Sequence, residues 1–136
     1  MNILIIDGMG GGLGKTIIEH IKPIAEARNA TITAVGTNSV ATAAMLKAGA
    51  NVAATGENAV VYNAAKADYI VGAIGIIATN AMNGEVTGKM AAAITASAAH
   101  KILVPVDKCS ITVLGKHHGN IAEYLSDIYR FFRLMP

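Results

Sequence analysis

A cluster of five glycines within seven residues, 8–14, constrains this chain most. It follows a short Ile-rich run, Asn2–Asp7, which predicts a buried strand. Apolar residues at helical spacing then extend over residues 13–29, and Pro23 is expected to kink that helix or split it in two. The chain is therefore predicted to open with a strand, a tight glycine turn and a helix.

Strand-like and helix-like segments continue to alternate along the chain. Further strands are predicted at residues 30–35, 51–54, 68–74, 101–106 and 110–114, and further helices at 39–48, 56–66, 88–99 and 120–134. Parallel strands need crossover connections, so this alternation predicts an α/β fold: a Rossmann-like three-layer sandwich. We expect a mostly parallel sheet of about five to six strands, in the order 3-2-1-4-5-6, with helices on both faces.

Composition narrows the class of protein. A length of 136 residues fits one domain spanning residues 1–136, and 53% hydrophobic with 15% charged residues excludes disorder. A net charge of +2 without a basic cluster argues against binding nucleic acid, and the longest apolar stretch, residues 69–78, is too short to cross a membrane. The single Cys109 cannot form an internal disulfide, so a cytoplasmic location is expected. His117 and His118 are adjacent and the other histidines scattered, so no metal centre is predicted.

The predicted loops differ between the two ends of the sheet. Loops at the carboxyl ends of the strands are polar and glycine-rich, whereas those at the amino ends look like ordinary solvated connections. Ligands of such sheets bind at the carboxyl ends of the strands, so we expect the site there.

The glycine turn is the strongest candidate for ligand binding. Glycines let backbone N–H groups approach a phosphate, and a helix N-terminus attracts an anion. The candidate cofactor-binding residues of this segment are Asp7, Gly8, Gly10, Gly11, Gly12, Gly14 and Lys15. Gly8, Gly12 and Gly14 match the G-x-x-x-G-x-G spacing of short-chain dehydrogenase-like domains. A P-loop is the rival, but it needs a glycine at Met9, and no later strand ends in a suitable Asp.

The residues at the end of the second predicted strand indicate which cofactor the chain could bind. NAD would call for an acidic residue there, and the chain has Thr37, Asn38 and Ser39 instead. These residues are candidates to bind NADP or another phosphorylated nucleotide or metabolite, or else to cap the following helix. Gly75, after the most apolar strand, completes the predicted cofactor-binding set.

The polar segment 75–89 is long for this fold and supplies further candidates. Asn80 and Asn83, with Glu57 and Asn58 from another loop, are predicted to contact substrate. Glu85 is a candidate base and Lys89 its electrophilic partner. The alternative is a helical Glu85–Lys89 pair without a catalytic role.

Three blocks resemble a family of short bacterial proteins classed as a domain of unknown function, with a Rossmann-like start. They read IDGxGGGxGK over residues 6–15, GTNxxAT over 36–42 and TGENA over 55–59. The resemblance extends to about residue 109 and implies the fold and the position of the site. A weaker similarity connects the chain to the fold group of sugar-phosphate isomerases and translation initiation factors, although Ile74 stands where that pattern has an acid.

Three functions are compatible with these patterns. The first is binding of a small phosphorylated ligand at residues 8–14, and the second is an isomerase-like enzyme that uses Glu85 and Lys89. The third is a regulatory or interaction subunit that acts through the C-terminal helix, where four of the six aromatic residues lie and through which a homo-oligomer would form: Tyr124, Tyr129, Phe131 and Phe132.

Overall fold

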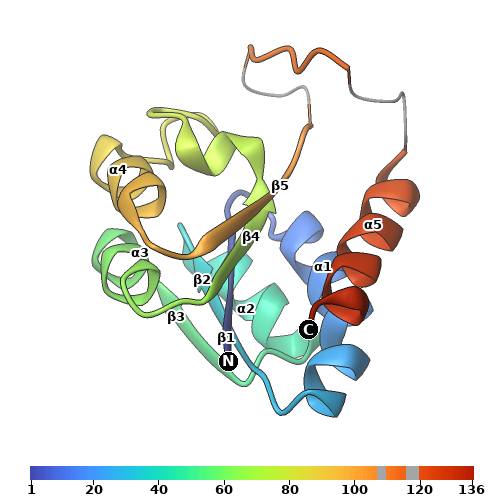
Figure 1. Cartoon of the computed structure of the whole chain (residues 1–136). Helices are drawn as coiled ribbons and strands as arrows, with labels where there is room; N and C mark the ends of the chain where they lie inside the picture. Colours follow the sequence, from blue (N-terminus) through green and yellow to red (C-terminus); the bar gives the residue numbers. More distant parts are fainter. Residues whose placement is uncertain (107–109, 116–119) are drawn as a thin grey trace.

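A computed structural model describes residues 1–106, 110–115 and 120–136 of the chain, and strands and helices alternate along it (Figure 1). The strands are β1 (Asn2–Asp7), β2 (Thr31–Gly36), β3 (Val52–Thr55), β4 (Tyr69–Ala73) and β5 (His100–Val104). The helices are α1 (Gly12–Ala27), α2 (Ser39–Ala48), α3 (Glu57–Ala64), α4 (Gly88–Ala96) and α5 (Ile121–Leu134), with a 3-10 turn, η1 (Ile74–Ile77), after β4.

The five strands form one parallel sheet in the order β3-β2-β1-β4-β5. The predicted α/β Rossmann-like fold is confirmed, and so is the predicted order of its first five strands. The chain order reverses beside β1, because β2 and β3 lie on one side of it and β4 and β5 on the other.

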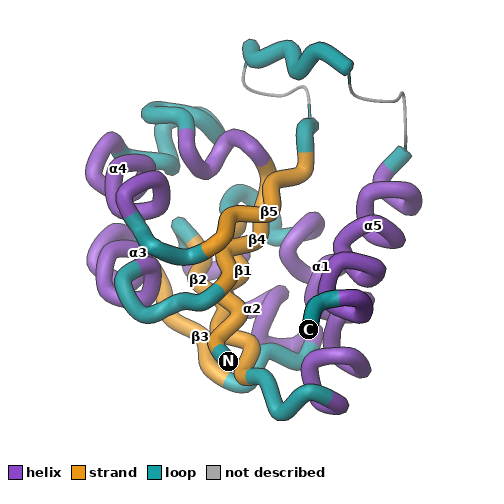
Figure 2. Tube along the Cα trace, viewed as in Figure 1, coloured by secondary structure: helices purple, strands orange, loops and turns teal. Residues whose placement is uncertain are grey.

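Each face of the sheet carries its own apolar core. Ile3 and Ile5 of β1 belong to the core beneath α1, α2 and α5, while Leu4 and Ile6 belong to the core beneath α3 and α4. Figure 2 shows the strands between these two groups of helices. A strand buried on both faces is continuously apolar. This explains why Asn2–Asp7 stood out in the sequence.

Helix α1 is continuous through Pro23, so the predicted split of this helix is wrong. Proline removes the hydrogen bond to the carbonyl four residues earlier, here that of Glu19. Both residues are exposed, so water can satisfy that carbonyl. The opposite face of α1 buries Ile17, Ile18 and Ile21, which fixes the helix on the sheet.

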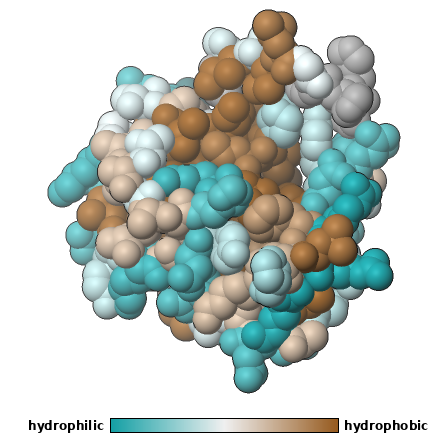
Figure 3. All heavy atoms as spheres, in the orientation of Figure 1, coloured by the Kyte–Doolittle hydropathy of each residue, from teal (hydrophilic) through white to brown (hydrophobic). Residues whose placement is uncertain are grey.

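The strand predicted at residues 110–114 is absent: residues 110–115 contain no strand, and Leu114 is 91% exposed. An alternating apolar run becomes a strand only beside a partner. Among the described residues, β5 pairs with β4 alone. In Figure 3, apolar residues gather in the middle of the face, around the carboxyl end of β5.

The predicted loop at residues 107–109, with Cys109, lies outside the described residues.

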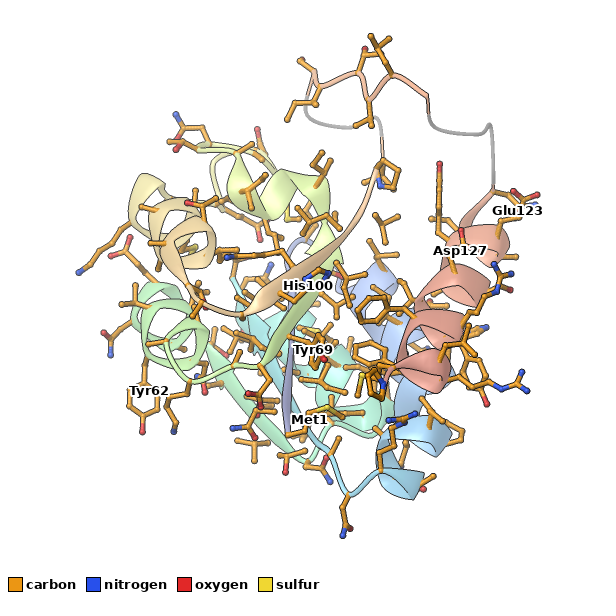
Figure 4. All side chains as sticks on the ribbon, viewed as in Figure 1. Met1, Tyr62, Tyr69, His100, Glu123 and Asp127 are labelled. Atoms are coloured by element: carbon orange, nitrogen blue, oxygen red, sulfur yellow. The ribbon has the colours of Figure 1, made fainter. Side chains whose placement is uncertain are left out.

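Helix α5 packs against α1, and its apolar stripe buries Leu125, Ile128 and Phe132. Phe132 meets Tyr69 edge-on at 5.4 Å between ring centroids, and the neighbouring Phe131 stacks on His100 at the same distance. Figure 4 marks Tyr69 and His100 beside this helix. The apolar stripe thus serves the core through Leu125, Ile128 and Phe132, of which only Phe132 is aromatic. No helix in the described part of the chain is long and apolar enough to span a membrane.

The two adjacent phenylalanines give a matched test of this packing. Phe132 is fully buried, whereas Phe131 is 36% exposed. Phe132→Ala should lower the free energy of unfolding by about 3–5 kcal/mol in urea denaturation, because it leaves a cavity. Phe131→Ala should cost roughly 1 kcal/mol. Equal losses for the two variants would contradict the packing described.

Candidate functional site

The candidate site lies at the carboxyl edge of the sheet, where the strand order reverses beside β1 (the upper end of the sheet in Figure 1). Open parallel sheets bind ligands at such switch points. Three segments meet there: the glycine loop, residues 8–14; the β2–α2 connection, residues 37–38; and the segment 78–87, which precedes α4.

Asp7, the last residue of β1, holds both ends of the glycine loop. Its Oδ1 accepts a hydrogen bond from the Gly8 N–H at 2.8 Å, and its Oδ2 accepts one from the Gly14 N–H at 2.7 Å. The side chain is 6% exposed, and this burial raises the pKa of Asp7, an effect that the nearby charge of Glu85 adds to and the two backbone hydrogen bonds oppose. Asp7 therefore fixes the loop to the sheet, and the amides it binds are taken.

The glycines of the loop fall into two groups. A Cβ on Gly8 would lie 2.5 Å from Thr37 Oγ1, and one on Gly14 would lie 2.5 Å from Met45 Sδ. Gly11 has a φ of 74° and faces the α2 backbone. Packing or backbone conformation thus accounts for these three. A Cβ on Gly10 or Gly12 would meet nothing within 4 Å, so packing does not require glycine at either position.

The N-terminus of α1 has no side-chain cap and no acidic residue in its first turn. Gly11, at the N-cap position, donates its N–H to the Gly8 carbonyl at 2.9 Å. Within the described part of the chain, the N–H groups of Gly10, Gly12 and Leu13 donate to no acceptor. These donors lie at the positive end of a helix dipole, an arrangement suited to binding an anion.

Glu85 connects all three segments. Its Oε1 accepts hydrogen bonds from the Met9 N–H at 2.9 Å, Thr37 Oγ1 at 2.7 Å and Asn38 Nδ2 at 2.6 Å. These bonds lower the pKa of Glu85, the one from Thr37 most, while slight burial opposes them. The side chain is therefore a fixed carboxylate at neutral pH.

The predicted helical pair of Glu85 and Lys89 is wrong. Glu85 precedes α4 and bonds to the other two segments, and no ion pair joins it to Lys89 among the residues described. Lys89 is exposed in the first turn of α4. Glu85 is held instead by a backbone donor of the glycine loop, Met9, and by two side-chain donors of the β2–α2 connection, Thr37 and Asn38.

Thr37 and Asn38 hold the segments of the site together, and Asn38 also caps α2. The Thr37 N–H donates to the Asp7 carbonyl at 3.0 Å. Asn38 Oδ1 caps α2 by accepting from the Ala41 N–H, and Asn38 Nδ2 donates to the Met9 carbonyl at 2.9 Å as well as to Glu85. Ser39 is exposed as the first residue of α2.

Asn80 and Asn83 shape the segment 78–87. Their φ values are 68° and 57°, and Met82 between them has a φ of 57°. Asn is among the residues that adopt this left-handed conformation most readily. Met82 lies against the glycine loop, since its Sδ would be 2.7 Å from a Cβ on Gly8. Asn80 and Asn83 are exposed, with no side-chain hydrogen bond among the described residues.

The remaining predicted site residues lie at the same edge of the sheet. Lys15 is exposed in the first turn of α1, and Gly75 is buried in η1. Glu57 is half-buried and Asn58 exposed in the first turn of α3. Within the described part of the chain, none of these four residues hydrogen-bonds to the Glu85 cluster, which comprises Glu85 and its three donors, Met9, Thr37 and Asn38.

A groove of about 570 Å³ lies beside α3, over the uncovered part of β2 and β3. Thr33 and Ala54 form part of its floor, and Asn58 and Tyr62 part of its wall. The glycine loop does not line it. No sequence motif indicated this groove, because it results from the short α3 leaving part of the sheet open.

Metal ligation has no support in the described residues, which contain no group of three or more His, Cys, Asp or Glu side chains placed to hold an ion. His117 and His118 lie outside the described residues.

Comparisons with known proteins give one family and one structural likeness. A family model described as "Domain of unknown function (DUF3842)" matches residues 2–133. A search of curated proteins finds no match. Among solved structures, the chain is similar to one titled "Crystal structure of universal stress protein in complex with cAMP", with 21% identity and a TM-score of 0.42 over 74% of this chain and 94% of the other.

The lowered pKa of Glu85 predicts how stability depends on pH. Its contribution to the free energy of unfolding is present above the ordinary Glu pKa of about 4.3 and is lost as the pH falls through the lower pKa of the folded state. Wild type should therefore be more stable than Glu85→Gln near neutral pH. The difference, measured by urea unfolding, should shrink between about pH 7 and about pH 3.

Glu19→Gln is the matched control, because Glu19 is exposed on α1 and makes no hydrogen bond to the site. If the stability difference between wild type and Glu85→Gln stays constant or grows on acidification, the charged Glu85 carboxylate does not stabilise the fold through these hydrogen bonds.

Proposed function

The chain belongs to the family described as Domain of unknown function (DUF3842), and we propose that it binds a small phosphorylated ligand, a nucleotide or phosphorylated metabolite, over the glycine loop. NADP is one candidate among these nucleotides. The ligand's phosphate would accept hydrogen bonds from the backbone N–H groups at the start of α1. We place this function in the cytoplasm, where nucleotides and phosphorylated metabolites are plentiful.

The proposal rests on one observation: two of the backbone N–H groups without an acceptor belong to glycines that packing does not require. The N–H groups of Gly10 and Gly12 have no acceptor among the described residues, and a side chain at either position would project into open space. Glycine in the first turn of a helix lowers stability relative to alanine. Close approach of a ligand to the backbone accounts for that cost.

The charges around the loop are compatible with an anion. Both oxygens of Asp7 already accept amide hydrogen bonds, and the exposed Lys15 lies in the first turn of α1. The helix dipole adds roughly half a positive charge at this end. These features offset the nearby carboxylate of Glu85.

The geometry gives less support to the other two functions. Hydrogen bonds lower the pKa of Glu85, which makes it a weaker base for an isomerase-like reaction with Lys89. The stripe of α5 expected to bind a partner is used in the core, where Leu125, Ile128 and Phe132 are buried. A homo-oligomer through α5 would have to use its exposed apolar residues, Ile121, Phe131 and Leu134.

Gly12→Val tests the proposal, because the new side chain would cover the loop and its Cβ would meet nothing within 4 Å in the fold. Thermal shift and calorimetry would use inorganic tripolyphosphate, ATP, ADP and NADP. At about 100 times the dissociation constant, a binding ligand should stabilise wild type by about 2.7 kcal/mol. Gly12→Val should lose this stabilisation while its melting temperature without ligand stays within a few degrees of wild type.

Ala27→Val is the control, since it adds similar bulk at the exposed far end of the same helix. It should bind as wild type does. Ligand binding that survives Gly12→Val unchanged would exclude the glycine loop as the site, and no binding of any of the four compounds to wild type would count against the proposed function as a whole.

A further inference from the structure

The carboxylate of Glu85 is oriented by bonds to only one of its two oxygens. Oε1 accepts three hydrogen bonds, whereas Oε2 accepts none from the described residues, and the side chain is only half-buried. Three donors around Oε1 hold the plane of the group, so Oε2 points in a defined direction. A charged carboxylate can only accept hydrogen bonds. A ligand group beside it must therefore be a donor.

We propose that Glu85 accepts hydrogen bonds from the ribose hydroxyls of a nucleotide bound at the glycine loop, and thereby selects a free 2′-hydroxyl over a 2′-phosphate. This inference rests on the proposed function and narrows its ligands to nucleotides whose ribose 2′-hydroxyl is free, which removes NADP from the candidates. Glu85 is the specificity-determining residue, and Thr37 and Asn38 position it.

The place of Glu85 in the fold supports this role. In dinucleotide-binding sheets, an acidic residue at the end of the second strand binds the ribose hydroxyls. Residues 36–39, at the end of β2, contain no acid. Glu85 brings a carboxylate to that point from a different loop, since it bonds to Thr37 across 48 residues of sequence.

The dimensions of the loop suit one nucleotide. Met9, which donates to Glu85, and Gly12, at the start of α1, are three residues apart, a span of at most about 10 Å. The hydrogen bond from the Gly11 N–H to the Gly8 carbonyl shortens it further. A 5′-phosphate at the Gly12 amide and a ribose at Glu85 can thus belong to the same nucleotide.

Charge supplies the discrimination. A 2′-phosphate beside the carboxylate would be repelled, and an enzyme or binding protein that accepts this group usually offers an Arg to it. The three segments of the site, residues 8–14, 37–38 and 78–87, contain no Arg or Lys, and the exposed Lys15 that follows the first of them on α1 forms no ion pair with Glu85 among the described residues. A free hydroxyl would instead donate a charge-assisted hydrogen bond to Oε2.

Three adenosine compounds separate these effects: AMP, 2′-deoxy-AMP and adenosine 2′,5′-bisphosphate. In calorimetry, the affinity of wild type for AMP should be at least about ten-fold higher than its affinity for either of the other two compounds. In Glu85→Gln, AMP should bind more weakly and the bisphosphate more tightly, so that the two affinities converge. Glu19→Gln, on the exposed face of α1, should keep the wild-type ratios.

A residue that merely braces the loop would change all three affinities alike and leave their ratios fixed. Unchanged ratios in Glu85→Gln therefore overturn the inference while the proposed function stands. If that variant fails to fold, the wild-type ratios decide: a bisphosphate that binds as tightly as AMP overturns the inference. If neither these compounds nor tripolyphosphate bind wild type, the proposed function fails and the inference with it.

Discussion

The hydrogen bonds between Asp7 and the two ends of the glycine loop are the interaction on which the site depends. Asp7 ends the central strand β1, of which only Asn2 is exposed, so its carboxylate lies where an unpaired charge would be costly. The Gly8 and Gly14 amides satisfy it at 2.8 and 2.7 Å. Strand β1 is held between the two apolar cores of the sheet. The hydrogen bonds of Asp7 therefore also fix where α1 begins and which way its first amides point.

The rest of the carboxyl edge is built around that contact. Gly8 has no side chain, which leaves room for Thr37, Met82 and Glu85 to approach the loop. Glu85 then joins the loop to the β2–α2 connection through a single oxygen. The two carboxylates thus differ: Asp7 is enclosed and holds the backbone, whereas Glu85 is half-exposed and its Oε2 accepts no hydrogen bond from the described residues.

Local sequence patterns were sufficient for most of the fold. The apolar run Asn2–Asp7, the glycine cluster and the Asn38 cap are short-range signals, and the structure follows them. Residues 110–114 show the limit, because a strand also needs a partner that no local pattern reveals. The role of Glu85 was beyond sequence reasoning for a similar reason: its donors Met9 and Thr37 are 76 and 48 residues away, and only the folded sheet brings them together. Its proximity to Lys89 in sequence suggested instead a catalytic base with Lys89 as its partner, or a helical pair of the two.

The central claim, that the first amides of α1 receive a ligand's phosphate, is most directly tested by NMR. Backbone amide resonances would be followed while inorganic tripolyphosphate is added to the uniformly labelled protein. The account predicts that the amides of Gly10, Gly12 and Leu13 shift most and saturate together, because they are the donors without acceptors in the described loop. Largest shifts along the groove beside α3, at Asn58 and Tyr62, or no saturable shift in the glycine loop, would contradict it.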